Sequence, residues 1–383
     1  MIRKEFLPLA RPDSTEDEIN NVVEVIKSGW WTTGPKVTEF ENTFSDYLCH
    51  NQPLYTVGLN SCTAALHLSL LALGIKPGDE VIVPTWTFAS TAQVVEWIGA
   101  IPVLCDIDEK TLNIDVEQAE LLITSKTRAL IPVHIAGYPC DMDSIKRLAT
   151  KFNLKVIEDA AHAIGTKYRG VKIGNYSDIT CFSFYATKNL AMGEGGAAVS
   201  RDPDVIEKVR KLSYFGINKE AFKRYLKSGT WIYDIEEIGY KNNLDSLHAA
   251  IGLAQLRRID IMNQRRRDIA QKYREALSDT LILPVDDQTN YHTYHLFIIR
   301  IPEKYILRDN MVMELKKRNI GTNVHFIPLH MHSYYKNKYK NNRFNVADKL
   351  FKEVLSIPMF PSMTDDDVEY VSSHINTIME NRL

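Results

Sequence analysis

Cysteine is scarce in this chain, and the few cysteines present follow no pairing pattern. The 383 residues include five cysteines, an odd number, and no two of them form a Cys-x-x-Cys pair. Scattered cysteines of this kind argue against a disulfide framework. We therefore expect a reduced, cytoplasmic protein, and we expect no metal site. The cysteines are Cys49, Cys62, Cys105, Cys140 and Cys181.

The chain also lacks an excess of either charge and lacks long apolar runs. Its 46 lysines and arginines nearly balance its 48 aspartates and glutamates, so it carries no electrostatic footprint for nucleic acid. No uncharged run approaches the ~20 residues that a membrane-spanning helix needs. Residues 1–6 lack the apolar core of a signal peptide. We expect a soluble protein that binds neither nucleic acid nor membrane.

Short β-rich runs alternate with helical stretches over the first two thirds of the chain. With 45% hydrophobic content, 383 residues can bury a large core and form more than one domain. Helices are predicted at 15–29, at 36–49 and at 61–73, the last with a Ser61 cap. The predicted strands are 80–83, 101–104, 129–133, 155–157, 180–184 and 197–200, and the helices between them are 91–98, 116–124 and 142–151. This alternation predicts an α/β fold with a mainly parallel sheet covered on both faces.

The last third of the chain has a different pattern. Residues 243–278 are helical and basic, and they predict a long connecting helix. The predicted elements beyond it are a strand at 295–300, a helix at 309–318, a strand at 322–326, a polar surface loop at 336–343 and a final helix from Thr364. We predict a large domain at 1–250, with the N-terminal helical segment, and a connecting helix with a small α+β domain at 251–383.

Two residues that could carry chemistry follow predicted strands. In an open α/β sheet, ligands bind beyond the carboxyl ends of the strands. Asp159 follows the strand 155–157, and Lys188 follows the strand 180–184, just before Gly193-Glu-Gly-Gly196. A lysine can hold the aldehyde of pyridoxal 5′-phosphate (PLP) as a Schiff base, and a carboxylate can keep the pyridine nitrogen protonated. This pair predicts a PLP enzyme.

Both residues also have ordinary structural explanations. Taken alone, Lys188 would be a surface lysine, and Asp159 would be a helix cap in a βα loop. The apolar residues before Lys188 and the glycines after it favour a lysine close to a ligand, because glycine lets the backbone approach. Burial would lower the pKa of Lys188 and so supply the neutral amine that a Schiff base requires.

Further candidates are expected at the same edge of the sheet. Phe88 follows the strand 80–83 and could stack on the pyridine face, although core packing is the usual fate of phenylalanine. Cys62 and Thr63 begin a helix, where the first amides favour an anion such as the PLP phosphate. The alternative for this segment is a plain helix cap.

Two more candidates lie beside the Asp159–Lys188 pair. Ser183 lies near the end of the strand 180–184 and could reach the same edge of the sheet. His162, three residues after Asp159, could support that carboxylate or the cofactor ring. Taken alone, His162 is better explained by packing within a helix.

Several motifs occur in order along the chain and together carry a family resemblance. They are Gly29-Trp-Trp-Thr-Thr-Gly-Pro35, Pro77-Gly-Asp-Glu-Val-Ile-Val-Pro84, Ile131-Pro-Val-His134, Val156-Ile-Glu-Asp-Ala-Ala-His162, Cys181-Phe-Ser-Phe-Tyr-Ala-Thr-Lys-Asn189, Gly239-Tyr-Lys-Asn-Asn-Leu244 and Ile357-Pro-Met-Phe-Pro361. Over nearly its whole length the chain resembles the DegT/DnrJ/EryC1/StrS family of sugar aminotransferases. These are PLP-dependent transferases of the type I (aspartate-aminotransferase-like) fold. The resemblance implies a mainly parallel seven-stranded sheet in the large domain and a small α+β C-terminal domain.

The resemblance also implies a role for each candidate. Lys188 is implied to form the Schiff base and to transfer the proton, and Asp159 is implied to pair with the ring nitrogen. The ring itself is implied to contact His162 and Phe88. The phosphate is implied to contact Cys62, Thr63 and Ser183. Asn243 matches an asparagine that reaches the phosphate from the other subunit, which implies a homodimer with shared active sites. Tyr185 and His325 are implied near the sugar. Ala186 replaces a common proline, a departure that removes no catalytic group.

Two further motifs, His295-Leu-Phe-Ile-Ile-Arg300 and Gly321-Thr-Asn-Val-His-Phe326, are most similar to enzymes that aminate C4 of UDP-linked 4-keto sugars. The 4-amino-4-deoxy-L-arabinose type is the nearest pattern. The implied reaction moves the amino group of L-glutamate to a nucleotide-linked keto sugar and leaves 2-oxoglutarate. The alternatives are a dTDP-3-keto-sugar C3 aminotransferase, a sugar dehydratase of the same fold and a non-catalytic PLP-binding protein. Such dehydratases carry histidine in place of the lysine, so Lys188 argues against them.

Overall fold

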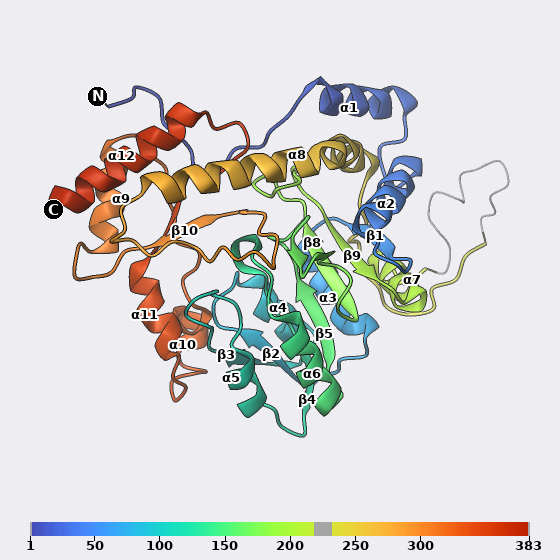
Figure 1. Cartoon of the computed structure of the whole chain (residues 1–383). Helices are drawn as coiled ribbons and strands as arrows, with labels where there is room; N and C mark the ends of the chain where they lie inside the picture. The colour runs from blue at the N-terminus through green and yellow to red at the C-terminus, as the bar shows by residue number, and fades with distance from the viewer. Residues whose placement is uncertain (1, 218–231, 382–383) are drawn as a thin grey trace.

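The computed structural model describes residues 2–217 and 232–381, and a seven-stranded sheet lies at its centre (Figure 1). The strands lie in the order β1-β9-β8-β5-β4-β2-β3. Their bounds are β1 (Tyr55–Leu59), β2 (Glu80–Pro84), β3 (Ile101–Cys105), β4 (Thr127–Leu130), β5 (Lys155–Asp159), β8 (Ile179–Ser183) and β9 (Gly196–Ser200). Within this sheet β9 runs antiparallel to β1 and β8, and the remaining neighbours are parallel. The predicted α/β fold with a mainly parallel seven-stranded sheet is confirmed.

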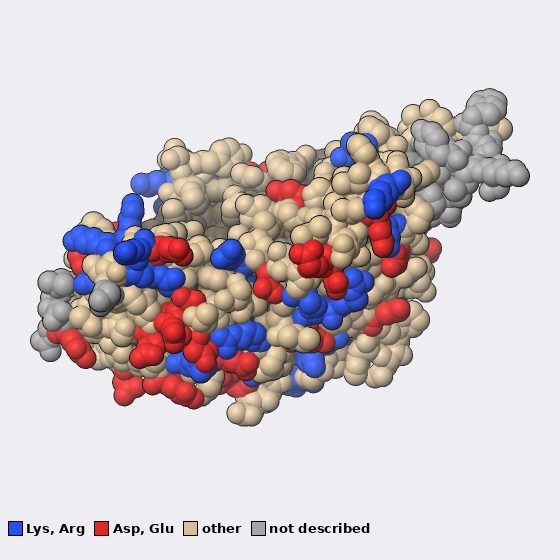
Figure 2. Space-filling model, turned by 90° about the horizontal axis from the view of Figure 1, so that it is seen from above, with Lys and Arg blue, Asp and Glu red and all other residues tan. Residues whose placement is uncertain are grey.

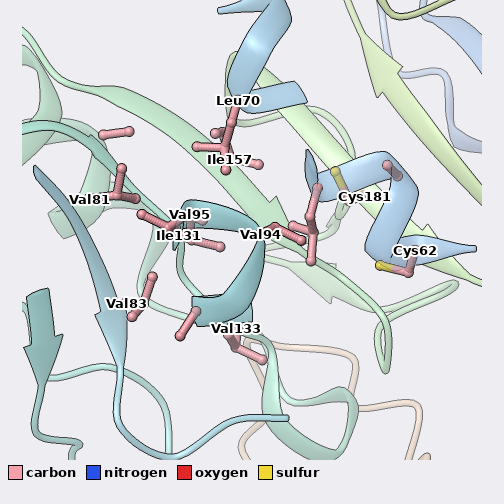
Figure 3. Packing of buried hydrophobic residues seen from close by; sticks show 14 of the residues in the cluster. Cys62, Leu70, Val81, Val83, Val94, Val95, Ile131, Val133, Ile157 and Cys181 are labelled. Carbon is pink, nitrogen blue, oxygen red and sulfur yellow. The ribbon is translucent and has the colours of Figure 1, made fainter. Parts of the chain in front are cut away.

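Helices cover both faces of the sheet because its strands are apolar on both faces. On β2, Val81 and Val83 belong to one buried cluster, and Ile82, between them, belongs to another. The first cluster includes residues of α3 (Cys62–Ala72), α4 (Ser90–Trp97) and α7 (Pro203–Ser213), and the second includes residues of α2 (Pro35–Leu48), α5 (Val116–Leu121), α6 (Met142–Phe152) and α8 (Ser246–Ala276). Figure 3 shows Val94 and Val95 of α4 near Val81 and Val83 of β2 and Ile157 of β5.

The long helix α8 connects the two ends of the molecule (Figure 1). It packs against α1 (Glu16–Ser28) and α2 near its start and against α12 (Asp365–Asn381) further along. Helix α1 begins with a capping box between Thr15 and Glu18 and ends at Gly29, whose φ of 72° is readily adopted only by glycine. The predicted helices at 15–29, 36–49, 61–73 and 243–278 are confirmed with small shifts of their ends.

A third buried cluster lies in the C-terminal part of the chain. A two-stranded antiparallel sheet of β10 (Phe297–Arg300) and β11 (Val354–Ile357) packs there with several helices. The remaining elements are α9 (Arg308–Lys317), α10 (Ser333–Lys336), α11 (Asn345–Glu353), the hairpin of β6 (Lys167–Tyr168) and β7 (Val171–Lys172), and the 3₁₀ turns η1 (Ile135–Gly137) and η3 (Leu329–Met331). The domain boundary at residue 250 falls inside α8 and stays a prediction.

Two predicted strands need correction, and several strands were missed. The predicted strand 322–326 is wrong: a single bridge joins Asn323 to Ser356, and the carbonyl of His325 accepts from the indole of Trp86 rather than from a neighbouring strand. The prediction for 129–133 runs too far, because β4 ends at Leu130. The strands β1, β6, β7 and β11 were not predicted at all.

The described surface carries both charge signs. Figure 2 shows lysines and arginines interspersed with aspartates and glutamates on the face seen from above. Within the described residues, no helix combines the length and the apolar character that a membrane span requires.

Candidate active site

A cavity of about 660 Å³ lies beyond the carboxyl ends of β5 and β8 and against the first turn of α3. Every predicted site residue except Asn243 lines this cavity. These residues are Cys62, Thr63, Phe88, Asp159, His162, Ser183, Tyr185, Lys188 and His325. The structure therefore brings together side chains that lie far apart in the sequence, as expected for the open edge of an α/β sheet.

Asp159 is the last residue of β5 and is buried, with 4% of its surface exposed. Its Oδ2 accepts a hydrogen bond from Thr91 Oγ1 (2.8 Å), and its Oδ1 accepts one from the amide of Ala161 (3.2 Å). Burial raises the pKa of Asp159 above its ordinary value, and the Thr91 and Ala161 hydrogen bonds and the nearby Lys188 act in the opposite direction. Carboxylate oxygens accept more than one hydrogen bond, so Asp159 keeps acceptor capacity for a ligand in the cavity.

Lys188 lies at the end of a tight turn that follows β8. Its amide donates to the carbonyl of Tyr185 (2.8 Å), and the amide of Ala186 donates to Gly193 (3.0 Å). Burial lowers the pKa of Lys188 from 10.5 to about 8. Within the described residues no acid forms an ion pair with this amine. A lysine with such a pKa supplies the neutral amine that carbonyl chemistry requires.

The first turn of α3 forms the opposite wall of the cavity. Ser61 caps this helix by accepting a hydrogen bond from the amide of Ala64 (3.1 Å). The amides of Cys62 and Thr63 belong to the first turn, where no carbonyl of the helix can accept from them. A β-carbon at Gly196 would lie 2.3 Å from the carbonyl carbon of Ser61, so only glycine allows β9 to approach this turn. The arrangement suits a phosphate.

Two ring side chains face the cavity from different elements. Phe88 lines the cavity, and 63% of its surface is exposed. Its ring therefore offers surface on which a flat ligand can stack. His162 Nδ1 accepts a hydrogen bond from the amide of Ala136 (3.3 Å), which leaves the proton on Nε2. Burial lowers the pKa of His162 well below 6.5, so this ring is neutral.

Residues that the sequence reasoning did not select also line or support the cavity. His295 has its ring centroid 4.3 Å from that of His162, and its Nδ1 lies 3.1 Å from Asn189 Oδ1. His295 stands in one of the motifs of the resemblance, which was the available signal. Thr91, which holds Asp159, had no signal in the sequence. The predicted His325 contacts Ser356 through Nδ1 (2.9 Å), and burial lowers its pKa to about 4.

Asn243 lies elsewhere. It lines a second cavity of about 790 Å³ between α2, β1 and α7, where its side-chain Nδ2 donates to Thr33 Oγ1 (2.6 Å). Its expected contact with the other subunit's cofactor stays a prediction. Within residues 2–217 and 232–381, no group of three or more histidines, cysteines or acids could hold a metal ion.

The residues present fit PLP. One cavity combines an amine that is easily neutral, a buried carboxylate, the first turn of a helix and an exposed aromatic ring, on a sheet with a single antiparallel strand. This fold and this site define a PLP-dependent enzyme of the type I fold.

Comparison with known proteins identifies the family. Residues 12–376 match the model of the DegT/DnrJ/EryC1/StrS aminotransferase family, and the chain belongs to this family. It is 45% identical over 385 residues to the spore coat polysaccharide biosynthesis protein SpsC of Bacillus subtilis, covering 99% of this chain and 98% of SpsC. The enzyme is thus a PLP-dependent member of an aminotransferase family.

Solved structures agree with this assignment. The putative sugar aminotransferase Spr1654 from Streptococcus pneumoniae, in its PMP form, is 35% identical with a TM-score of 0.90 and covers 98% of this chain and 100% of its own. DesV of S. venezuelae, in complex with a ketimine intermediate, is 33% identical with a TM-score of 0.87 and covers 95% of each chain. Relatives bound to PLP or PMP identify the cofactor of the family.

Proposed function

We propose that this enzyme transfers the amino group of L-glutamate to C4 of a UDP-linked 4-keto sugar. The observation that carries the proposal is the meeting of Lys188 and Asp159 in one cavity. Sugar aminotransferase activity is named for the relative Spr1654, and polysaccharide biosynthesis is named for SpsC. The two motifs typical of C4 enzymes support the regiochemistry, because His295, His325 and Phe326 line the cavity.

The side chains have distinct tasks in this proposal. Bound PLP supplies an electron sink that makes the proton on the donor carbon removable. Lys188 takes this proton and returns it, which its lowered pKa of about 8 favours, because a useful fraction of the amine is neutral near pH 7. Asp159 accepts from the protonated ring nitrogen, Phe88 and His162 contact the ring, and Cys62, Thr63 and Ser183 hold the phosphate. Tyr185 and His325 contact the sugar.

A panel of substrates tests the proposal. Purified enzyme is incubated with glutamate and either UDP-4-keto or dTDP-3-keto sugars, and products are identified by mass spectrometry and NMR. We expect a 4-amino sugar and stoichiometric 2-oxoglutarate, with ping-pong kinetics because 2-oxoglutarate leaves before the keto sugar binds. Amination at C3, or loss of water without amination, would replace this proposal by one of its rivals.

We further propose a homodimer in which Asn243 completes the partner's site. A mixed dimer of Lys188→Ala and Asn243→Ala chains tests this. If the sites are shared, one of the two sites in the mixed dimer contains both original residues and is active, although each variant alone is impaired. Mixing that restores no activity beyond that of the separate variants would show that Asn243 acts within its own chain or not at all.

A further inference from the structure

Asp159 is held by two hydrogen bonds of different kinds. Thr91 Oγ1 lies 2.8 Å from Oδ2, and the amide of Ala161 lies 3.2 Å from Oδ1. The Ala161 amide belongs to the backbone, so this donor does not depend on the identity of any side chain. The hydroxyl of Thr91 is therefore the one side-chain donor to Asp159 among the described residues, and it is fully buried.

The direction of the hydrogen bonds around Thr91 follows from counting protons. A hydroxyl has one proton, and an ionised carboxylate can only accept, so the proton of Thr91 points to Asp159. Thr87 Oγ1 lies 2.8 Å from Thr91 Oγ1, and it must then be the donor in that contact. Thr87 is 2% exposed and lies at the wall of the cavity, so the chain Thr87 to Thr91 to Asp159 runs through buried protein, where aligned donors strengthen one another.

Thr91 is the second residue of α4, so no turn of its own helix precedes it and offers a carbonyl to its hydroxyl. The hydroxyl instead donates to the end of β5. The loop before α4 is fixed as well, because Thr85 Oγ1 contacts His330 Nδ1 (2.7 Å) and the indole of Trp86 donates to the carbonyl of His325 (3.1 Å).

We propose that Thr91 is a positioning residue of the reaction, which orients the Asp159 carboxylate toward the cofactor ring, and that Thr87 supports Thr91 in this task. The inference rests on the proposed contact of Asp159 with the ring nitrogen. Loss of the Thr91 hydroxyl leaves Asp159 Oδ2 without its donor, disfavours the charged carboxylate and lowers the share of protonated ring nitrogen.

A graded series at position 91 tests the inference by PLP affinity and by the pH titration of the bound cofactor's absorbance. Because a hydrogen bond to a charged group changes an equilibrium by about tenfold or more, Thr91→Val should weaken PLP binding about tenfold. Thr91→Ser should stay within about twofold, and Thr91→Cys, a weaker donor, should fall between them. The midpoint of the titration should also move to higher pH, least in Thr91→Ser, more in Thr91→Cys and most in Thr91→Val. The reason is that a less positive ring leaves the nitrogen that joins Lys188 to the cofactor more basic.

Thr87 supplies a second, milder variant. Thr87→Val should weaken PLP binding about threefold, the size expected for one neutral hydrogen bond. Combined with Thr91→Val it should add nothing, because the contact that it supports is already gone. Full additivity of the two changes would overturn the directed chain.

The controls separate this inference from the proposed function. Parental affinity and a parental titration midpoint in Thr91→Val would overturn the role of Thr91, provided that Asp159→Asn disturbs both. If Asp159→Asn itself leaves both unchanged, the proposed role of Asp159 fails. If Thr91→Val does not fold, Thr91→Cys decides, since parental values in that variant would equally contradict the inference.

Discussion

Glu158 and Asp159 are consecutive acids at the end of β5, and their surroundings differ completely. Side chains alternate along a strand, so the two carboxylates point to opposite faces. Glu158 is fully buried and accepts from Ser177 Oγ (2.6 Å), Thr180 Oγ1 (2.8 Å) and His134 Nε2 (2.8 Å). Asp159 has one hydroxyl and one amide as partners and lines a cavity that also holds Lys188.

The histidines beside these acids differ in the same way. His134 is fully buried and uses both ring nitrogens, since Nδ1 accepts from the amide of Cys140 (3.0 Å) and Nε2 contacts Glu158. Among the described residues, His162 forms a hydrogen bond through Nδ1 alone. Its Nε2 is not enclosed by protein, so this nitrogen is open to the cavity that the ring lines. A saturated acid–histidine pair stabilises the fold, whereas an acid and a histidine that keep free hydrogen-bonding capacity beside a cavity are available for chemistry.

The largest expected effect falls on the cavity side of this comparison. Lys188→Ala should reduce turnover by at least about a thousandfold, because the residue both holds the cofactor and moves the proton. Lys172→Ala is the matched control, since burial also lowers the pKa of Lys172 but its amine lies over the ring of Tyr47 outside the cavity. Steady-state rates with saturating PLP measure the difference. Near-parental turnover in Lys188→Ala would contradict the site.

Exchanging charge for amide at each acid tests the comparison directly. Asp159→Asn should lower turnover by about a hundredfold or more with a modest change in melting temperature. Glu158→Gln should instead lower the free energy of unfolding by about 1–3 kcal/mol, because its new NH2 group must face either the ring N–H of His134 or the hydroxyls that donate to the carboxylate. Denaturant unfolding and single-turnover rates of the folded fraction give both numbers. Equal effects of the two changes on turnover would break the distinction.

The pH dependence of stability sharpens the assignment of Lys188. Burial lowers its pKa from the ordinary 10.5 to about 8 in the folded protein, so the unfolded chain binds the proton more tightly. The stability of the parent relative to Lys188→Met should therefore be lowest below about pH 8 and should rise between about pH 8 and 10.5. Denaturant unfolding of both cofactor-free proteins at several pH values measures this. If the stability difference between the two proteins does not vary with pH, the amine of Lys188 is exposed to solvent rather than buried.

The smallest expected effect concerns the two histidines. His162→Gln keeps a donor and an acceptor beside the ring, so turnover should change by less than about fivefold. His134→Gln should leave the turnover of folded enzyme unchanged but lower its melting temperature, because a flexible amide cannot hold both Cys140 and Glu158 in place. Thermal melting and initial rates distinguish the two sites.

Much of the fold could be predicted because the strands of the parallel sheet are apolar runs between helices with clear caps. The strand β1 is as long as β2 and β3, and it was missed because Gly58 weakens its strand pattern. Packing explains this glycine: a β-carbon there would lie 2.8 Å from Leu244. The strand β11 was missed because it follows α11 without a turn residue between them. Local signals were absent in both cases.

The site could be predicted as a set of residues but not as an arrangement. Lys188 and Asp159 follow strands, and that position in the sequence was enough to select them. No local signal in the sequence marks Thr91, because its role depends on a hydrogen bond to Asp159, 68 positions away. Asn243 lines a second cavity, and its expected contact with the other subunit's cofactor stays a prediction.

The order of residues along the chain by itself determined the alternating strands and helices, the lysine after β8, the acid at the end of β5 and the capped start of α3. These features depend on local periodicity and capping, which neighbouring residues decide. Tertiary structure alone decided that β9 lies between β1 and β8, that Glu158 is saturated while Asp159 is not, that Thr91 holds Asp159, and that His295 lines the cavity. Such features depend on contacts between distant segments, which form only when the sheet and α8 pack together.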